Sequence, residues 1–201
     1  MEIKKEYSKR IRNKSQFASL SEVFYSDRLF KTYNDIARLK GEGVDLGSGD
    51  GSFGKVCRYN NISSIPFDYP MTDFETDYLS VKSNIIDFVT MNAVIEHINN
   101  PNNIFNEIRR ILKDGGFLFI RTPNWKLDYK NFYNDPTHVK PYSADTLRSL
   151  LELFGFEVIH LEPGLILKSD LYYRIPFKWK IASMIKGGTK SIIAVGKLHK
   201  K

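Results

Sequence analysis

The feature that most constrains this 201-residue chain is a run of glycines within residues 43–54, which read Gly-Val-Asp-Leu-Gly-Ser-Gly-Asp-Gly-Ser-Phe-Gly. Val44 to Leu46 is typical of the end of a buried strand, and Gly47, Gly49 and Gly51 follow at alternate positions. Glycines in this spacing leave a tight strand-to-helix turn free of Cβ atoms, so a ligand can lie against bare backbone. The turn, residues 47–51, is called the glycine loop below.

The charges around the glycine loop indicate which ligand it suits. Gly49, Gly51 and Gly54 also satisfy the G-x-G-x-x-G spacing of dinucleotide sites. A pyrophosphate, however, binds to unpaired N–H groups at a positive helix end, and this chain has carboxylates at Asp45 and Asp50. Two negative charges are better placed beside a sulfonium cation and hydroxyl donors than beside a diphosphate. The loop therefore favours S-adenosylmethionine over NAD.

Three stretches carry further motifs in one consistent order. Val44–Gly51 is an acidic residue followed by alternate glycines, Ile85–Ile98 contains a strand followed by Asn-Ala-Val-Ile-Glu-His, and Ile104–Ile120 ends in Leu-Lys-Asp-Gly-Gly-Phe-Leu-Phe-Ile. These stretches resemble the first motif, the fourth-strand motif and the fifth-strand motif of the class I S-adenosylmethionine-dependent methyltransferases. The resemblance covers residues 43–160 and is closest to the small-molecule branch, types 11 and 23. It implies methyl transfer to oxygen or nitrogen of a small-molecule acceptor.

Hydrophobic spacing predicts strands that alternate with helices along a single domain, residues 1–201. Such alternation is typical of an α/β fold, here a Rossmann-like domain whose mostly parallel, twisted sheet has helices on both faces. The predicted helices are 25–40, 52–59, 101–113 and 144–154. The first predicted strand ends at Leu46, and further strands are predicted over 62–67, 117–121, 156–161 and 191–197. Only 16 residues separate Asp68 from Ile85, which is too few for a full helix and strand. We therefore expect the third-strand region to be shortened.

The domain divides into four parts. We expect an N-terminal helical cap over 1–41, a cofactor-binding core over 43–161, an aromatic and basic lid over 163–190, and the last strand over 191–197.

Carboxylates and small residues at the strand ends form the predicted cofactor site. Asp68 follows Gly47 by 21 residues, and a carboxylate at the end of the second strand either accepts the ribose hydroxyls or is a solvated acid in a turn. Tyr69 is then expected beside the adenine. Asp77 occupies the place where the resemblance implies an acid near the adenine amino group, or it is a surface acid. The full predicted set is Asp45, Gly47, Ser48, Gly49, Asp50, Gly51, Asp68, Tyr69, Asp77, Asn92 and Ala93, the last two facing the methionine part of the cofactor.

Two histidines are the candidate catalytic residues. His97 follows the fourth-strand motif, and His138 lies in a loop, Thr-His-Val-Lys-Pro-Tyr-Ser, after the fifth strand. An imidazole titrates near neutral pH, so either residue is a candidate to orient the acceptor or to take its proton. The alternative is that packing holds His97 and that a backbone hydrogen bond holds His138. No run of histidines and acids has metal-ligand spacing, so no metal ion is predicted.

The net charge of +7 is concentrated at the two ends of the chain. Residues 1–14 carry +4 and residues 163–201 carry +8, so the body between them carries −5. An acidic body suits a cationic cofactor, whereas basic ends indicate either an anionic partner or a solvated surface. Residues 171–185 mix aromatic and basic side chains. This segment is interpreted as a lid over an anionic or lipid-linked acceptor, with a weak membrane-surface contact as the alternative.

Composition limits the remaining function classes. The chain is 42% hydrophobic and 26% charged, has no transmembrane stretch, and starts without the apolar core of a signal peptide, so a cytoplasmic protein is expected. One cysteine, Cys57, excludes an intramolecular disulfide. A sugar or glycan precursor is the favoured acceptor, and no nucleic-acid partner is expected. The alternatives are an RNA or protein methyltransferase, suggested by a pI of about 9.3, and a non-catalytic cofactor-binding or NAD-binding protein. The oligomeric state is not predicted.

Overall fold

The computed structural model of the protein describes residues 20–163 and 191–200. Within these residues, six strands form one sheet in the order β2-β1-β3-β4-β6-β5. β1 to β4 are parallel, and β6 runs antiparallel between β4 and β5. The strands are β1 (Glu42–Leu46), β2 (Ser63–Phe67), β3 (Ile86–Asn92), β4 (Leu112–Pro123), β5 (Phe156–Pro163) and β6 (Ser191–Leu198). The predicted mostly parallel α/β sheet is confirmed.

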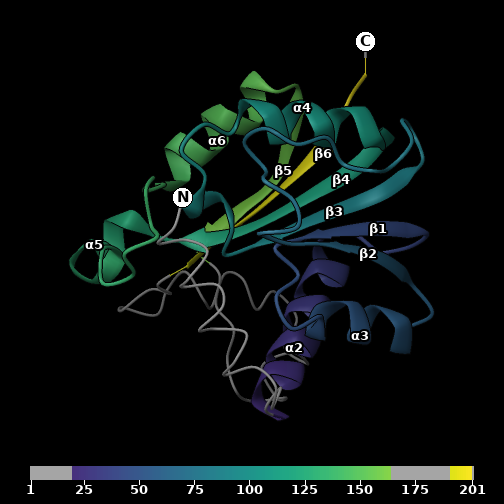
Figure 1. Ribbon diagram of the computed structural model, residues 1–201, viewed down its shortest axis with the longest axis horizontal. Helices are drawn as coiled ribbons and strands as arrows, with labels where there is room; N and C mark the ends of the chain where they lie inside the picture. Colours follow the sequence, from purple (N-terminus) through teal and green to yellow (C-terminus); the bar gives the residue numbers. More distant parts are fainter. Residues whose placement is uncertain (1–19, 164–190, 201) are drawn as a thin grey trace.

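Helices cover both faces of the sheet, as Figure 1 shows. α2 and α3 lie on one face and α4 and α6 on the other, while α5 lies beyond the end of the sheet at the left of the view. Their bounds are α2 (Leu20–Ile36), α3 (Ser52–Tyr59), α4 (Asn102–Ile111), α5 (Trp125–Phe132) and α6 (Ala144–Leu153), and a short 3₁₀ turn, η1 (Ile95–His97), follows β3.

Alternate side chains of the strands supply two separate cores. On β3, Val89 packs in the cluster that contains Ile104 of α4, and its neighbour Phe88 packs in the cluster that contains Tyr33 of α2 and Phe53 of α3. All five side chains are at most 5% exposed. Because consecutive strand residues point to opposite faces, a strand buried on both sides is apolar throughout. The two cores hold the strand ends in fixed positions.

The region of the expected third strand is short and irregular. Between β2 and β3 the chain forms turns instead of a helix and a strand, so β2 is an edge of the sheet. Glu107 of α4 accepts a hydrogen bond from Leu79 N at 2.9 Å, and Arg110 donates to the carbonyl oxygens of Leu79 and Val81 at 2.9 and 2.8 Å. These charged side chains replace the hydrogen bonds of a strand and fasten the segment to α4.

Two predicted elements had wrong bounds. The helix expected over 25–40 is α2, which begins earlier, at Leu20. It ends at Ile36 because the Asn34 side chain then accepts a hydrogen bond from Leu39 N at 3.1 Å and turns the chain toward β1. The strand expected over 117–121 begins earlier, at Leu112, which pairs with Ile86. The other predicted bounds agree within two residues.

α5 was not predicted. It lies in a stretch that is rich in Asn, Asp and aromatic residues and was expected to be a loop. The Asn124 side chain caps its first turn by accepting a hydrogen bond from Lys126 N, and Trp125 packs edge-on against Phe132 with ring centroids 5.5 Å apart. This short helix positions the loop that carries His138.

The predicted lid over 163–190, including the aromatic and basic segment 171–185, lies outside the described residues except for Pro163. Residues 1–19 of the predicted N-terminal cap lie outside them as well. In the part of the chain that the structure describes, no helix combines the length and apolar character needed to cross a bilayer.

Candidate functional site

The glycine loop lies at the carboxyl edge of the sheet, the edge at which β1, β2, β3 and β4 end. Gly47 N and Ser48 N both donate to the carbonyl oxygen of Phe67, at 2.8 and 3.1 Å, and so tie the loop to the end of β2. Gly47, Gly49 and Gly51 have φ values of 72°, 53° and 74°, which side chains disfavour. A Cβ added at Gly49 or Gly51 would meet no atom within 4 Å. The outer part of the loop therefore exposes its backbone.

Gly47 brings the glycine loop against the segment that follows β3. A Cβ added at Gly47 would lie 2.2 Å from Val94 Cγ2, so only glycine permits this contact. Val94 directly precedes η1, which contains His97. The predicted cofactor loop and the predicted catalytic segment are therefore in direct contact.

Asp45 is a buried carboxylate at the base of the glycine loop. It is 3% exposed, and its Oδ1 accepts a hydrogen bond from the Thr90 hydroxyl on β3 at 2.7 Å. Burial raises the pKa of Asp45 to about 7; the hydrogen bond from Thr90 opposes the shift, and the nearby charges of Asp68 and Asp50 add to it. A cation bound beside the loop would favour the ionised form of Asp45.

Asp50 and Asp68 both follow Asp45 in the chain and lie near its carboxylate. The carboxylate of Asp50 accepts hydrogen bonds from the backbone N–H of Ser52, at 3.0 Å, and from the Ser52 hydroxyl, so it pairs with the first residue of α3. Asp68 directly follows β2, and its Oδ1 accepts a hydrogen bond from Tyr69 N at 2.9 Å. Both acids are close enough to Asp45 to raise its pKa. Three predicted carboxylates thus gather around the loop.

Asp77 is placed differently from these three acids. It is exposed, and its carboxylate accepts hydrogen bonds from Asp73 N at 2.8 Å and the Thr76 hydroxyl at 3.1 Å, all within one turn. The side chain of Asn103, on α4, donates to its carbonyl oxygen at 3.0 Å. Asp77 therefore orders the turns that replace the third strand. Its contact with adenine, like that of Tyr69, stays a prediction.

Asn92 and Ala93 lie where β3 ends. Ala93 has a φ of 54° and donates its N–H to the Arg121 carbonyl oxygen at 2.8 Å. The Asn92 side chain accepts a short hydrogen bond from the hydroxyl of Tyr33, a fully buried residue of α2. The pKa of the Tyr33 hydroxyl is raised, mainly by burial, so this group remains a donor. The helical spacing of α2 identified Tyr33 only as a core residue, and nothing in the sequence indicated where its hydroxyl lies.

Glu96 is the second buried carboxylate of the carboxyl edge. It is 0% exposed, and its Oε2 accepts a hydrogen bond from the Thr122 hydroxyl on β4 at 3.0 Å. Its Oε1 has no hydrogen-bond partner among residues 20–163 and 191–200. Burial raises the pKa of Glu96 to about 7, and the Asp135 carboxylate adds to the shift, whereas the backbone N–H of Glu96 itself, the Thr122 bond and the Arg121 guanidinium oppose it. Burying a carboxylate with one unpaired oxygen costs free energy of folding, and a bound ligand that pairs this oxygen would offset the cost.

The two candidate histidines meet beside Glu96. Their ring centroids lie 4.7 Å apart although the residues are separated by 41 positions. His97 Nδ1 lies 3.1 Å from the carbonyl oxygen of Thr137, and His138 Nδ1 lies 2.6 Å from that of Phe132. The backbone N–H groups of Val139 and Lys140 donate to the Glu96 carbonyl oxygen, at 2.9 and 3.1 Å, so the loop is fastened over η1. The structure therefore brings together the two residues that the sequence singled out.

Sequence reasoning left Glu96 out of the site, although it is adjacent to His97. The available signal was its setting in Val-Ile-Glu-His-Ile, because an acid within an apolar run is either buried with a partner or functional.

Tyr142 was also missed. Its hydroxyl is buried without a hydrogen-bond partner among the described residues, and the pKa of this hydroxyl is raised by burial and by the charge of Glu96. The effect of Glu96 on this pKa shows that the Tyr142 hydroxyl lies near the Glu96 carboxylate.

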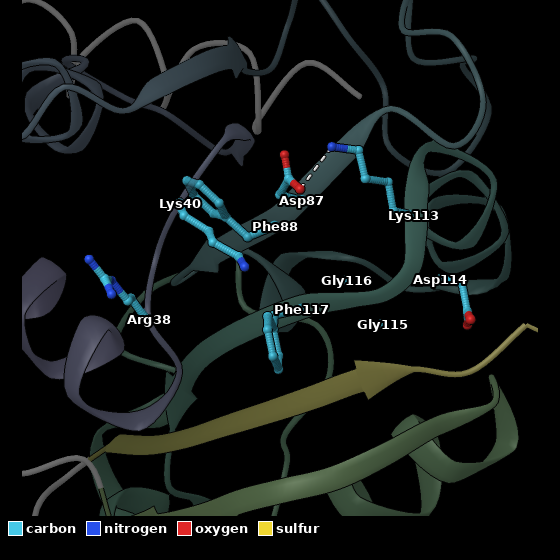
Figure 2. A pocket seen from close by; sticks show the side chains of 9 residues that line it. All are labelled: Arg38, Lys40, Asp87, Phe88, Lys113, Asp114, Gly115, Gly116 and Phe117. Carbon is cyan, nitrogen blue, oxygen red and sulfur yellow. Dashed lines mark hydrogen bonds and ion pairs between the residues drawn. The ribbon is translucent and has the colours of Figure 1, made fainter.

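A separate pocket of about 200 Å³ lies at the opposite edge, where β3 and β4 begin. Figure 2 shows Lys113 reaching across it to Asp87, and the two form an ion pair at 2.8 Å. Arg38 and Lys40 line the same pocket. None of the predicted cofactor or catalytic residues lies there, so the site is assigned to the carboxyl edge.

Comparison with known proteins agrees with this geometry. A family model described as "Methyltransferase domain" matches residues 20–161. The chain therefore belongs to this methyltransferase family and is an enzyme, as the resemblance of its motifs implied. No curated protein matches the chain significantly.

Solved structures share the fold at low sequence identity. An S-adenosylmethionine-dependent methyltransferase from Archaeoglobus fulgidus is 22% identical with a TM-score of 0.65, over 91% of this chain and 96% of that one. One from Aquifex aeolicus is 13% identical with a TM-score of 0.62, over 95% and 98% of the two chains. One from Clostridium acetobutylicum is 12% identical with a TM-score of 0.59, over 95% and 97%.

The carboxyl edge suits the expected cofactor, S-adenosylmethionine. The backbone at Gly49 and Gly51 is open where a Cβ would meet nothing within 4 Å, and buried Asp45 offers a charge that a cation would stabilise. Asp68 offers carboxylate oxygens at the end of β2. These groups match a ligand that carries a positive charge and hydroxyl groups, whereas a diphosphate would face three acids.

Proposed function

We propose that the protein transfers the methyl group of S-adenosylmethionine to an oxygen or nitrogen of a small-molecule acceptor held at Glu96, His97 and His138. The contact between Gly47 and Val94 carries this proposal, because it sets the cofactor loop directly against the segment that leads to these three residues. Methyl transfer is an in-line displacement, so donor and acceptor must be aligned at short range.

On the cofactor side, each group has a distinct task. Asp68 accepts the ribose hydroxyls, the backbone of the glycine loop supports the ligand, and Asp45 supplies negative charge. Asn92 and Ala93 face the methionine part, with Tyr69 and Asp77 on the adenine side. Bound here, S-adenosylmethionine supplies an electrophilic methyl group, which is the reactive part of the chemistry.

On the acceptor side, the cluster offers hydrogen-bond acceptors. A backbone carbonyl only accepts, so the Nδ1 atoms of His97 and His138 carry protons, and in the neutral rings the Nε2 atoms are the acceptors. His138 Nε2 lies 4.0 Å from Asp135 Oδ2. Glu96 Oε1 adds a further acceptor. Three acceptors in one place suit a molecule with several O–H or N–H donors, which supports a sugar or glycan precursor. The imidazoles orient this molecule and take up its proton.

The charge of the acceptor is inferred from the chain ends. The excess of basic residues in 163–201 and the aromatic residues of 171–185 favour an anionic or lipid-linked acceptor, with weak membrane-surface contact by the same segment. We expect no nucleic-acid partner. A labelled product found in RNA or protein would replace this acceptor class with a macromolecular one.

The first test is ligand-induced stabilisation. S-Adenosylmethionine and S-adenosylhomocysteine should raise the melting temperature, and at about 100 times the dissociation constant the gain is about 2.7 kcal/mol. NAD and NADP should leave it unchanged. Stabilisation by NAD alone would overturn the proposal. The acceptor is then found by incubating the protein with methyl-labelled cofactor and cell metabolite fractions and identifying the labelled product.

A further inference from the structure

Glu96, His97 and His138 offer three ligand atoms that all lie within 4.8 Å of one another. An ion bound at about 2.1 Å holds neighbouring ligand atoms roughly 3–3.4 Å apart and opposite ones about 4.2 Å apart. Small rotations of the side chains would therefore bring the three atoms onto one ion. No sequence pattern indicates this set, because two of its members come from η1 and the third from a loop 41 positions later.

The two imidazoles are already oriented as metal ligands are. Each donates its Nδ1–H to a backbone carbonyl, that of Thr137 for His97 and that of Phe132 for His138. This leaves Nε2 as the nitrogen with a lone pair. Metal-binding histidines almost always use their second nitrogen in this way, which fixes the tautomer and the ring plane.

The hydrogen bonds continue behind the His97 ring. The Thr137 hydroxyl lies 2.9 Å from His97 Nδ1 and donates to Asp135 Oδ1 at 2.6 Å. The oxygen of this hydroxyl is therefore free to accept from the imidazole. The carboxylate of Asp135 thus polarises the His97 imidazole through the Thr137 hydroxyl. This makes His97 Nε2 a better metal ligand.

Glu96 supplies an independent observation. It is completely buried, its Oε2 is held by Thr122, and its Oε1 lacks a partner among residues 20–163 and 191–200. Buried polar oxygens are paired in the large majority of cases. A cation shared with the two imidazoles would satisfy this oxygen and offset the cost of burying its charge.

We propose that Glu96, His97 and His138 form a binding site for a divalent transition-metal ion of the Zn²⁺ class. Two imidazoles and one carboxylate suit Zn²⁺ and Co²⁺, whereas Mg²⁺ and Ca²⁺ prefer oxygen ligands alone. Three protein ligands leave a coordination position open, as in catalytic rather than structural sites.

At the open coordination position, the ion would bind the hydroxyl of the methyl acceptor. This part of the inference rests on the proposed function. With the ion bound, the two imidazoles are its ligands and no longer take up the proton; an acceptor hydroxyl bound to the ion instead loses its proton to water more readily. The oxygen then forms the new O–C bond while the C–S bond breaks, and the electron pair of that bond stays on sulfur, which becomes a neutral thioether. The ion would thus select an acceptor through its hydroxyl oxygen.

The test is metal binding by the full-length protein without a polyhistidine tag, after treatment with a chelator and desalting. CoCl₂ is added and the visible absorption of bound Co²⁺ is recorded, and ZnCl₂ is then added as competitor. The variants Glu96→Gln and His138→Ala each remove one ligand. His199→Ala is the matched control, because His199 faces a carboxylate of Glu157 at 2.8 Å on the surface and belongs to no group of three ligands among the described residues.

We expect one Co²⁺ per chain, displaced by Zn²⁺. Each ligand variant should lose more affinity than the roughly 10- to 100-fold that the loss of an outer hydrogen bond costs, and His199→Ala should equal the parent. Co²⁺ binding that is absent in the parent, or unchanged in both ligand variants, would overturn the proposal. Circular dichroism checks that the variants are folded.

Binding of S-adenosylhomocysteine, measured by calorimetry on the same samples, separates this inference from the proposed function. A parent that binds S-adenosylhomocysteine but not Co²⁺ contradicts the metal site alone. A parent that binds Co²⁺ but not S-adenosylhomocysteine supports the metal site and contradicts the cofactor assignment.

Discussion

Two buried carboxylates, Asp45 and Glu96, mark the two halves of the candidate site. Each is held by a threonine hydroxyl from the neighbouring strand, Thr90 for Asp45 and Thr122 for Glu96. Burial raises the pKa of both to about 7. The surroundings differ, because the charges that raise the pKa of Asp45 come from other acids of the glycine-loop region, whereas Glu96 lies beside two histidines and keeps one unpaired oxygen.

This difference shows that two carboxylates buried to a similar extent can suit different ligands. The acids near Asp45 form a negative region on an open backbone loop, which suits a cation that arrives with its own hydroxyl groups. Glu96 lies within 4.8 Å of ligand atoms of both histidines and suits a small cation or a hydrogen-bonded acceptor. The two halves should therefore respond separately to substitution.

The largest effect is expected on turnover. His138→Ala and Glu96→Gln should lower methyl transfer to the acceptor identified by the labelling screen by about 10²–10⁴-fold, since each removes a group that aligns or deprotonates the acceptor. Rates measured with saturating cofactor are compared with those of His199→Ala, which should equal the parent. Variants as active as the parent would remove the cluster from the reaction.

A second, smaller effect separates Gly47 from Gly49 within the loop. Gly47→Ala should lower the free energy of unfolding by about 2–4 kcal/mol, because positive φ is disfavoured for Ala and the new Cβ overlaps Val94. Gly49→Ala has the same backbone strain but no clash, so about 1–2 kcal/mol is expected. Urea unfolding of both variants measures the difference. Equal losses would show that the contact with Val94 does not constrain the loop.

The smallest effect, taken per pH unit, is a pH dependence of stability due to Asp45. Its pKa is about 7 in the folded protein and its ordinary value is 3.8, so between these values the folded state holds a proton that the unfolded chain releases. The free energy of unfolding should therefore fall as pH rises from about 4 to 7, by up to about 1.4 kcal/mol per pH unit.

Asp45→Asn isolates this contribution. Other groups titrate in the same range, Glu96 among them, so the difference between parent and variant is the quantity to measure by urea unfolding at several pH values. The variant should show a shallower fall in stability over this range. The same slope in both proteins would contradict the burial-driven pKa of Asp45.

Local patterns predicted that the residues of the proposed cofactor half lie together at one edge of the sheet. The glycine loop, Asp45 and Asp68 are close in sequence to strand ends, and parallel strands bring their carboxyl ends to one edge. The shortened third-strand region followed from counting residues between Asp68 and Ile85. These features depend on the positions of glycines and strand ends and on the number of residues between them, which can be read from the sequence.

The acceptor half could be predicted only in part. His97 and His138 were recognised individually, but their contact depends on α5 and on the bonds from Val139 and Lys140 to Glu96. α5 has no clear hydrophobic period, and its position comes from aromatic packing around Trp125. A cluster built from segments 41 positions apart has no spacing that a sequence pattern can reveal.

The most direct test of the two-part site is calorimetric titration of S-adenosylhomocysteine into the parent, Asp68→Ala and Glu96→Gln. Asp68→Ala loses charge-assisted hydrogen bonds to the ribose, so affinity should fall by about 10- to 100-fold, which corresponds to about 1.5–3 kcal/mol. Glu96→Gln should bind as tightly as the parent. The account is contradicted if the parent does not bind, or if Glu96→Gln loses affinity while Asp68→Ala keeps it.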